Sequence, residues 1–381
     1  MTIGGLWKWF VVLLVSVGLG VSLGCSKTES QEVKFGAILP LTGDGAPYGT
    51  ALKKGMDLAI EQVNMKGGIN GKRLVVAFED DRNLPQDGVT AFNKLRSVDK
   101  VPMVIGAMFS AVTLAIAPIA QKDKIVLLSP TSSDVSLTSA GDYIFRIYPS
   151  DAYDGEFLGN FAFDRLQARK VAVISMQASS TISVSQLFKK VFEGKGGTVV
   201  SEETFREGTT DFRAALTKIK QQQQDLVFLP AALKEAALVL RQAKELGASA
   251  KFLGISTLFD PKLIELAGNA AEGLLFSSPV FDAASQAPEI RAFADAYKGR
   301  YKAEPDILGA YGYDTVNISV AALSNAISGQ TTPEAIKDAL YKIKDYKGVT
   351  GLMSFDSNGD VTKELRIMKV SAGKFVPFLQ N

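Results

Sequence analysis

Two groups of hydroxyl side chains in the first half of the chain have the residue types and positions to bind a small anion. Ser110 follows the predicted strand 103–107 and opens a predicted helix. The Thr-Ser-Ser segment 131–133 follows the predicted strand 125–129. Backbone amides at a helix start carry partial positive charge, and a serine there adds a hydroxyl donor. A carboxylate could therefore bind without an arginine, although both groups also suit an ordinary helix cap and a polar turn.

Residues 6–25 have the pattern of a bacterial export signal. Lys8 supplies the positive flank, residues 10–21 are almost entirely apolar, and small residues precede Cys25. The cysteine there resembles the lipoprotein processing motif, whose thiol receives diacylglycerol, although Ser22 departs from the usual aliphatic residue. A cleaved secretion signal and a membrane anchor are the alternatives, and the run is short against the roughly 20 residues of a membrane span. We expect residues 1–25 to be a lipoprotein signal peptide and 26–32 a tether.

The composition excludes several classes of chemistry. The 381 residues include no histidine and only one cysteine, so histidine-dependent hydrolysis and, with Cys25 lipidated, thiol chemistry are excluded. The balance of 42 basic and 40 acidic residues gives no electrostatic footprint for nucleic acid. No dinucleotide-binding or phosphate-binding glycine motif is present. We expect no cofactor and no metal, although carboxylate-only or cofactor chemistry is not excluded.

The adjacent carboxylates Asp80 and Asp81 are the pair that could suggest acid–base catalysis. Neighbouring residues of a strand point to opposite faces, so the two side chains cannot converge on one substrate. We interpret the pair as a solvated strand end and predict that the protein is not an enzyme. Turnover by the purified protein would reverse that prediction.

Short β-branched strands alternate with amphipathic helices along the rest of the chain, which predicts an α/β fold with mostly parallel sheets. The first set of strands is predicted at 33–39, 73–79, 103–107, 125–129 and 143–148, and the second at 170–175, 198–204, 225–230, 251–255 and 273–278. Two such sets predict two similar lobes, each a sheet flanked by helices, with a ligand cleft between them at the carboxyl ends of the strands.

Motifs along the whole chain after residue 33 resemble the type I periplasmic solute-binding proteins, in the leucine/isoleucine/valine-binding branch of ABC transporters. The motifs that carry the resemblance are FGAILPLTG at 35–43, Tyr48-Gly49, the helix end 64–71, Asp80-Asp81, 104–106, Ser129-Pro130, 267–273 and AYGYD at 310–314. The resemblance implies a two-lobed fold that closes around its ligand. Lobe one would comprise 33–147 and 281–350, and lobe two 148–280 and 351–381, with hinges near 147–150 and 278–282.

The resemblance also implies a function and a set of partners. The protein would be a monomeric periplasmic receptor, held at a bacterial membrane only through its lipid, that captures a small carboxylate-bearing ligand and delivers it to an ABC permease. The ligand would be a branched-chain or other amino acid, or an aromatic or aliphatic acid. A sensor that presents its closed form to a signalling partner is the alternative, because one chain does not distinguish the two.

The family positions that contact ligand fall on polar and apolar residues of this chain. In lobe one, Ser110 would bind the ligand's carboxylate, and Ser132 and Ser133 would contact both the carboxylate and the ammonium. Met108 and Phe109 would form an apolar wall, and Tyr48 would line the cleft. In lobe two the candidate contacts are Asp154, Ser180, Ser256 and Thr257.

Three lobe-two positions depart from the family pattern. Ser256 stands where an acid normally pairs with the ligand's ammonium, Ser180-Thr181 replace a tyrosine and glycine, and Ala232 replaces a second tyrosine. A buried ammonium without a carboxylate partner costs several kcal/mol. The pocket has therefore lost an acid and two aromatic rings.

Two ligand classes fit these departures. In the first, Asp154, which replaces a family glutamine, supplies the missing charge and an amino acid still binds. In the second, the ligand has a carboxylate but no α-ammonium, and Asp151 and Asp154 merely cap a helix. We favour the second at this point, because the hydroxyl residues are retained while the ammonium-pairing acid is lost.

Overall fold

The computed structural model describes residues 32–248, 250–325 and 331–378. The predicted signal peptide, Cys25 and most of the predicted tether lie outside the described residues. None of the helices in the described part of the chain has the length and apolar content needed to cross a lipid bilayer.

Lobe one is built on a five-stranded parallel sheet with the strand order β2-β1-β3-β4-β5. Its strands are β1 Glu32–Leu39, β2 Arg73–Asp80, β3 Met103–Ile105, β4 Val126–Ser129 and β5 Ile144–Arg146. Its helices are α1 Ala46–Met65, α2 Pro85–Ser97, α3 Ser110–Asp123, α9 Pro288–Tyr301, α10 Ile307–Asn325 and α11 Pro333–Tyr341. The parallel strands bring the loops after β3 and β4, which carry the predicted hydroxyl residues, to one edge of the sheet.

Lobe two is built on a seven-stranded sheet with the order β15-β14-β10-β9-β8-β6-β7. The parallel strands are β6 Lys170–Met176, β7 Thr198–Phe205, β8 Leu226–Leu229, β9 Lys251–Gly254 and β10 Leu275–Pro279, and β14 Leu365–Ser371 and β15 Lys374–Pro377 add to them antiparallel. The helices are α4 Asp151–Asn160, continued by a π turn at Phe161–Arg165, α5 Ser179–Gly194, α6 Arg213–Lys220, α7 Leu233–Glu245 and α8 Lys262–Ala267.

A third, small antiparallel sheet corrects the predicted lobe boundary. It comprises β11 Tyr346–Gly348, β12 Gly351–Phe355 and β13 Val361–Lys363. Met353, Phe355 and Val361 are buried in the apolar core of lobe one. Residues 351–363 therefore belong to lobe one and not, as the sequence suggested, to lobe two, because their apolar side chains pack under β4 and β5.

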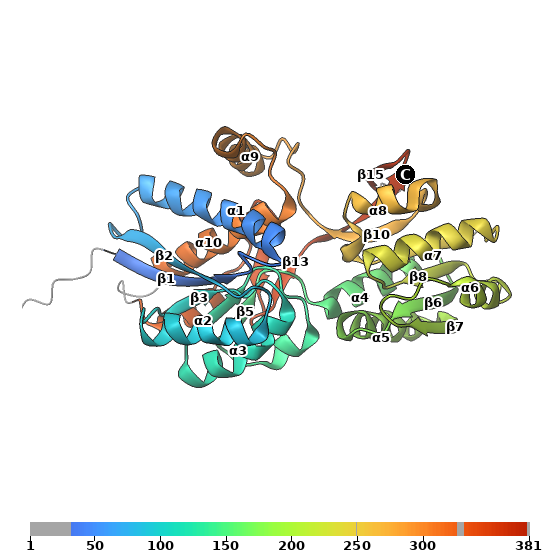
Figure 1. Cartoon of the computed structure of the whole chain (residues 1–381), viewed down its shortest axis with the longest axis horizontal. Helices are drawn as coiled ribbons and strands as arrows, with labels where there is room; N and C mark the ends of the chain where they lie inside the picture. Colours follow the sequence, from blue (N-terminus) through green and yellow to red (C-terminus); the bar gives the residue numbers. More distant parts are fainter. Residues whose placement is uncertain (1–31, 249, 326–330, 379–381) are drawn as a thin grey trace, which may run out of the picture.

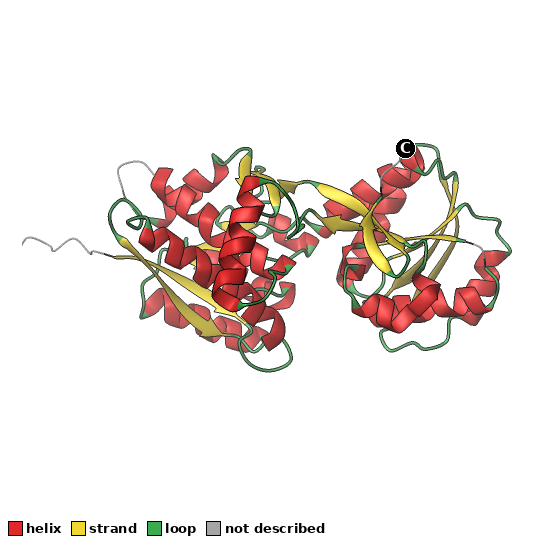
Figure 2. Cartoon of the chain, turned by 90° about the horizontal axis from the view of Figure 1, so that it is seen from above, coloured by secondary structure: helices red, strands yellow, loops and turns green. Residues whose placement is uncertain are grey.

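The chain passes between the lobes three times (Figures 1 and 2). We call these segments the first crossing (147–150), the second crossing (280–287) and the third crossing (Glu364), which lie between β5 and α4, β10 and α9, and β13 and β14. The two lobes lie side by side along the long axis of the molecule, and the crossings form the narrow middle. The predicted hinge at 147–150 coincides with the first crossing, and the one at 278–282 overlaps the second.

Helix α1 forms where predicted because it presents an apolar stripe to the core of lobe one. Leu52, Met56 and Val63, spaced at helical intervals on α1, are buried in the core of lobe one. Helix α1 also packs along α10 at very short range, because Gly55 and Gly312 have no side chains to separate the two backbones. The cores of the two lobes are separate, so each lobe can move as a body about the crossings.

Candidate functional site

Ser110 is the first residue of α3, and its side chain connects the start of that helix to the Thr-Ser-Ser segment that follows β4. Phe109 occupies the N-cap position in extended backbone and makes no side-chain cap. Ser110 Oγ accepts hydrogen bonds from the backbone N–H groups of Ser133, at 3.2 Å, and Asp134, at 3.3 Å. Both acceptor lone pairs are thereby used, so the hydroxyl hydrogen is left to donate. The residue thus offers a donor beside the positive end of a helix, which suits an anion.

Ser132 lies beneath the site and not on its surface. The side chain is buried, and its Oγ bonds to the Met108 carbonyl at 3.2 Å and to Thr113 Oγ1 at 2.8 Å. Ser129 Oγ accepts the backbone N–H of Ser132 at 3.0 Å. The Ser132 hydroxyl is therefore committed to holding the loop, and Ser133, which is only half buried, is the better-placed member of the pair.

The predicted apolar wall adjoins this loop. Met108 is buried, and its carbonyl also accepts the Thr131 hydroxyl at 2.8 Å. The ring of Tyr48, which is 45% exposed, meets the half-buried ring of Phe109 edge to face with centroids 6.2 Å apart. An edge of the Tyr48 ring is thus free for a ligand's apolar part.

A buried arginine fixes the hydroxyl-bearing loop from below. Arg146 Nη1 donates to the carbonyl of Asp134 at 2.7 Å, and the same guanidinium binds Thr138 and Asp360. Its side chain is 1% exposed. The arginine therefore positions the loop and is not a ligand contact.

The start of α4 brings two acids next to this loop. Ser150 caps the helix, since its Oγ accepts the backbone N–H of Ala152 at 3.2 Å, so neither Asp151 nor Asp154 is needed as a cap. The backbone N–H of Asp151 donates to the carbonyl of Ser133 at 2.8 Å. Through that bond the lobe-one hydroxyl loop touches the first turn of the first lobe-two helix.

Asp154 lies directly beneath the loop that lacks the family's acid. It is 6% exposed, and its Oδ2 accepts the backbone N–H of Ser256 at 3.4 Å. Tyr148 Oη donates to Ser256 Oγ, also at 3.4 Å. Asp154 Oδ1 and Asp151 Oδ2 are buried with no hydrogen-bond partner among the described residues. The carboxyl group missing at Ser256 is therefore present one layer below it, on Asp154.

Burial sets the protonation of both acids. Burial raises the pKa of Asp154, with the hydroxyls of Ser277 and Ser256 and the backbone N–H of Ser256 acting in the opposite direction. Burial likewise raises the pKa of Asp151 to about 7, against the lowering effect of the Ser133 hydroxyl. A positive charge brought close to either group would favour its ionised form.

The remaining lobe-two predictions lie at the edge of this site. Ser180 is half buried in the first turn of α5, where Thr181 Oγ1 binds back to Met176 and Ala178. Thr257 is exposed and its Oγ1 donates to the Ala231 carbonyl at 3.1 Å. Ser180 follows the carboxyl end of β6 and Thr257 that of β9, although no hydrogen bond in the described residues links either to Asp154.

The Asp80-Asp81 pair is not simply a solvated strand end. Asp80 Oδ1 accepts the backbone N–H groups of Leu41, at 2.8 Å, and Arg82, at 2.9 Å, so it organises the turns after β1 and β2. Asp81 is fully buried, and burial raises its pKa to about 6. The expectation of solvation was wrong for Asp81 because its backbone pairs with Leu39 and turns its side chain inward.

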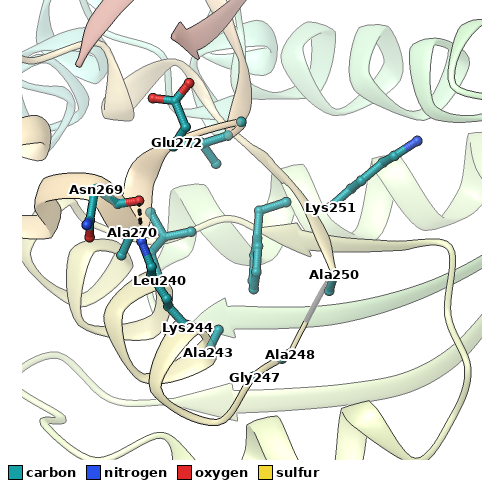
Figure 3. Close-up of a pocket in the computed structure, with 13 residues that line it drawn as sticks. Leu240, Ala243, Lys244, Gly247, Ala248, Ala250, Lys251, Asn269, Ala270 and Glu272 are labelled. Carbon is teal, nitrogen blue, oxygen red and sulfur yellow. Dashed lines mark hydrogen bonds between the residues drawn. The ribbon is translucent and has the colours of Figure 1, made fainter. Parts of the chain in front are cut away.

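A hollow of about 540 Å³ lies at the far end of lobe two (Figure 3). It lies between the end of α7 and the start of β9, lined by small and apolar residues such as Ala243, Ala250 and Phe252. Lys244 on its rim donates to the carbonyl of Asn269 at 3.1 Å. This hollow is at the amino ends of the strands, opposite the loops that carry the candidate residues, and we do not assign the ligand to it.

Known proteins share this arrangement. The sequence matches the family described as periplasmic binding protein over residues 32–374. The chain belongs to this family. A leucine-, isoleucine-, valine-, threonine- and alanine-binding protein of Pseudomonas aeruginosa is 30% identical over 333 residues, covering 87% of this chain and 88% of that protein.

Two solved structures are similar throughout. A leucine-binding protein of Thermotoga maritima has 30% identity and a TM-score of 0.78, covering 91% of this chain and 98% of the other. A branched-chain amino acid transporter substrate-binding protein of Streptococcus pneumoniae, solved with isoleucine, has 31% identity and a TM-score of 0.76, covering 90% and 97%. Members of this family are periplasmic solute receptors, and the two-lobed α/β fold predicted from the sequence is confirmed.

Proposed function

We propose that this periplasmic receptor captures a small α-amino acid between its lobes and delivers it to an ABC permease. Ser110, Ser133 and the start of α3 supply donors for the carboxylate, and Asp154, with Asp151 beside it, supplies the negative charge for the ammonium. Tyr48, Met108 and Phe109 form the apolar wall for the side chain.

The observation that carries this choice of ligand is the buried Asp154 carboxyl group, whose Oδ1 has no hydrogen-bond partner among the described residues. A buried acid with no cation beside it is costly, and a ligand ammonium would relieve that cost. Its position beneath Ser256 means that the charge has moved from the loop after β9 to the first turn of α4. This geometry favours an amino acid over the non-amino carboxylate that the sequence alone suggested.

Calorimetry on the mature protein tests the proposal. L-Leucine and L-alanine are titrated against benzoate, with Asp154→Asn and the exposed Asp211→Asn as a matched pair of variants. We expect an L-amino acid to bind the parent and the Asp211 variant, with the Asp154 variant weakened about 100-fold or more, as for loss of a buried charge partner. Affinity should rise with pH, because the ammonium requires an ionised Asp154. Tight benzoate binding that is insensitive to Asp154→Asn would sink the proposal.

Membrane attachment is a separate part of the proposal. We propose a monomeric lipoprotein without enzymatic turnover, and the leader pattern with the single Cys25 supports the lipid anchor. Mass spectrometry of the protein purified from membranes should show a diacylglycerol-modified N-terminal cysteine, and Cys25→Ser should release the chain into the periplasm. Recovery of an unmodified chain from the membrane would count against lipid anchoring.

A further inference from the structure

The outer end of lobe one carries a group of exposed basic side chains. The five strands of the lobe-one sheet are parallel and all begin at this end, where α1, α2 and α3 end. In Figure 1 it is the end of lobe one away from lobe two, where β1 begins. The exposed cations lie at the helix ends and on the turns into the next strands, at Lys66, Arg73, Lys100, Lys122 and Lys124. We call this surface the basic end face.

The acids on the basic end face leave these five cations uncompensated. Asp99 pairs with Lys34 at 2.6 Å, and Asp123 pairs with Arg96. Glu32 and Glu334 add two further acids. None of the five cations makes an ion pair or a side-chain hydrogen bond within the described residues. The face therefore has a net positive charge that is available to an anionic partner.

Two exposed apolar side chains lie among the cations. Met65, at the end of α1, is 72% exposed, and Val98, just after α2, is 73% exposed. They are the most exposed of the large apolar side chains in the described residues. Apolar side chains flanked by lysines suit the boundary of a bilayer, where the lysines contact headgroups and the apolar groups enter the acyl region.

A hollow of about 490 Å³ opens on the same face, beside the start of β1. Lys34, Arg96 and Lys100 line it together with the apolar side chains of Val101 and Ile125. The basic residues suit the phosphate of a lipid headgroup, because phosphate accepts charge-assisted hydrogen bonds. The hollow therefore has the chemistry to receive a headgroup.

The outer end of lobe two provides a comparison within the same chain. Helix ends attract basic residues in both lobes, because the carboxyl end of a helix carries partial negative charge. In lobe two, however, Lys220 donates to the carbonyl of Leu246 at 3.0 Å and Lys244 to that of Asn269 at 3.1 Å. These lysines are bound to their own lobe, whereas the five cations of the basic end face are not.

The predicted tether joins the protein at this face. The first residue of β1, Glu32, is opposite Arg73 in the parallel register of β1 and β2. Only residues 26–31 separate Glu32 from Cys25. A fully extended chain spans about 3.3–3.6 Å per residue, so the start of β1 is at most about 25 Å from a lipid on Cys25. This step depends on the lipid anchor proposed above, and it places the basic end face next to the bilayer.

We propose that the basic end face of lobe one binds a phospholipid bilayer that carries anionic headgroups, with the cations on the headgroups and Met65 and Val98 at the acyl boundary. The loops that carry Ser110 and Ser133 follow the carboxyl ends of the strands, at the opposite edge of the same sheet. The ligand site therefore faces away from the bilayer and stays open while lobe one is bound to it.

Vesicle co-sedimentation of the mature chain with Cys25→Ser, which carries no lipid, tests the surface by itself. The vesicles are phosphatidylcholine alone or phosphatidylcholine with about 30% phosphatidylglycerol. Since a lysine near an anionic surface contributes a factor of about five, we expect the parent to bind the anionic vesicles at least tenfold more tightly than the neutral ones. This binding should weaken as the salt is raised from about 50 to about 500 mM, because the Debye length shortens.

Two triple variants separate the face from the net charge of the protein. The test variant carries Lys66→Gln, Lys100→Gln and Lys122→Gln, and its affinity for the anionic vesicles should fall about 100-fold. The control variant loses the same charge from exposed positions of lobe two, at Lys190→Gln, Lys251→Gln and Lys262→Gln, and should stay within about twofold of the parent. All six lysines are exposed, so both variants should have the circular dichroism spectrum of the parent.

Two results would overturn the proposal. One is a parent protein that binds anionic and neutral vesicles equally or binds neither. The other is an equal loss of affinity in the two triple variants, which would show that only the total charge matters. Because the protein in this experiment carries neither a lipid nor a ligand, its failure leaves the Cys25 anchor and the amino-acid proposal standing. An unmodified Cys25 or a failed amino-acid titration likewise leaves the vesicle result unchanged.

Discussion

Arg146 binds both carboxylate oxygens of Asp360, with Nε 2.6 Å from Oδ1 and Nη2 2.9 Å from Oδ2. The two residues are 214 positions apart and are both largely buried, at 1% and 14% exposure. The backbone N–H of Arg146 also donates to the Gly359 carbonyl at 3.1 Å. This pair fastens the turn before β13 to the end of β5, so the roots of the first and third crossings are held together within lobe one.

Removing one member of this pair should be costly. Asp360→Ala leaves a buried guanidinium without its charge partner, and we expect the free energy of unfolding to fall by about 3–5 kcal/mol. Urea denaturation followed by circular dichroism measures this. The control is Asp164→Ala, whose partner Lys195 and own side chain are 33% and 48% exposed and whose loss should cost at most about 1 kcal/mol. Equal effects of the two substitutions would contradict the assignment.

Ser110→Ala should weaken ligand binding without unfolding the protein. The substitution removes the free hydroxyl donor and the acceptor that holds the Ser133 and Asp134 amides. A charge-assisted hydrogen bond contributes about 1.5–3 kcal/mol, so the Kd for an L-amino acid that binds the parent should rise roughly 10- to 100-fold. Calorimetry measures this, with the exposed Ser139→Ala in the same loop as the control. A change of less than about twofold would show that Ser110 only holds the Ser133 and Asp134 loop in place.

The sequence predicted the elements well because each element is encoded locally. The stripe of Leu52, Met56 and Val63 marks α1 without reference to any other part of the chain. The lobe boundary was missed because the short strands β12 and β13 carry no sign of which sheet they join. Their assignment depends on Met353 and Phe355 packing under strands about 200 residues earlier.

The candidate site was predictable in its residues but not in its charges. The sequence placed Ser110 and Asp154 in the site, and it also revealed the missing acid at Ser256. It gave no sign that Asp154 lies under Ser256, because that contact joins residues 102 positions apart. The role of Arg146 was missed for the same reason, since that residue belongs to no local pattern.

Asp151 should make the protein less stable as the pH rises from about 4 to 7. Burial raises its pKa from 3.8 to about 7 in the folded state. Below pH 4 both states are protonated and the stabilising contribution is fully present. Between pH 4 and 7 the folded state keeps the proton while the unfolded state loses it, so stability falls, and above pH 7 the loss is complete. The side chain in Asp151→Asn cannot titrate, so the variant's stability should change less between pH 4 and 7. At pH 8 the variant should unfold at a higher urea concentration than the parent.

Urea denaturation between pH 4 and 8 tests this sign. Asp295→Asn, an exposed carboxylate on α9, is the control and should follow the parent profile. Parallel profiles for parent and Asp151→Asn would show that the carboxyl is not protonated in the folded protein. An opposite slope, with the parent gaining stability toward pH 7 relative to the variant, would show that a cation pairs with Asp151.

Gly312 should tolerate no side chain, because a Cβ there would lie 2.0 Å from the carbonyl oxygen of Leu52 on α1. Gly312→Ala must push α10 away from α1 in the core of lobe one, and overpacking of this kind typically costs about 1–3 kcal/mol. Gly299→Ala is the matched control on α9, where a Cβ would have nothing within 4 Å. The control should gain up to about 1 kcal/mol from the better helix propensity of alanine. Thermal and urea denaturation should therefore shift in opposite directions for the two variants, and a shift in the same direction would mean that helix propensity, not contact between α1 and α10, governs position 312.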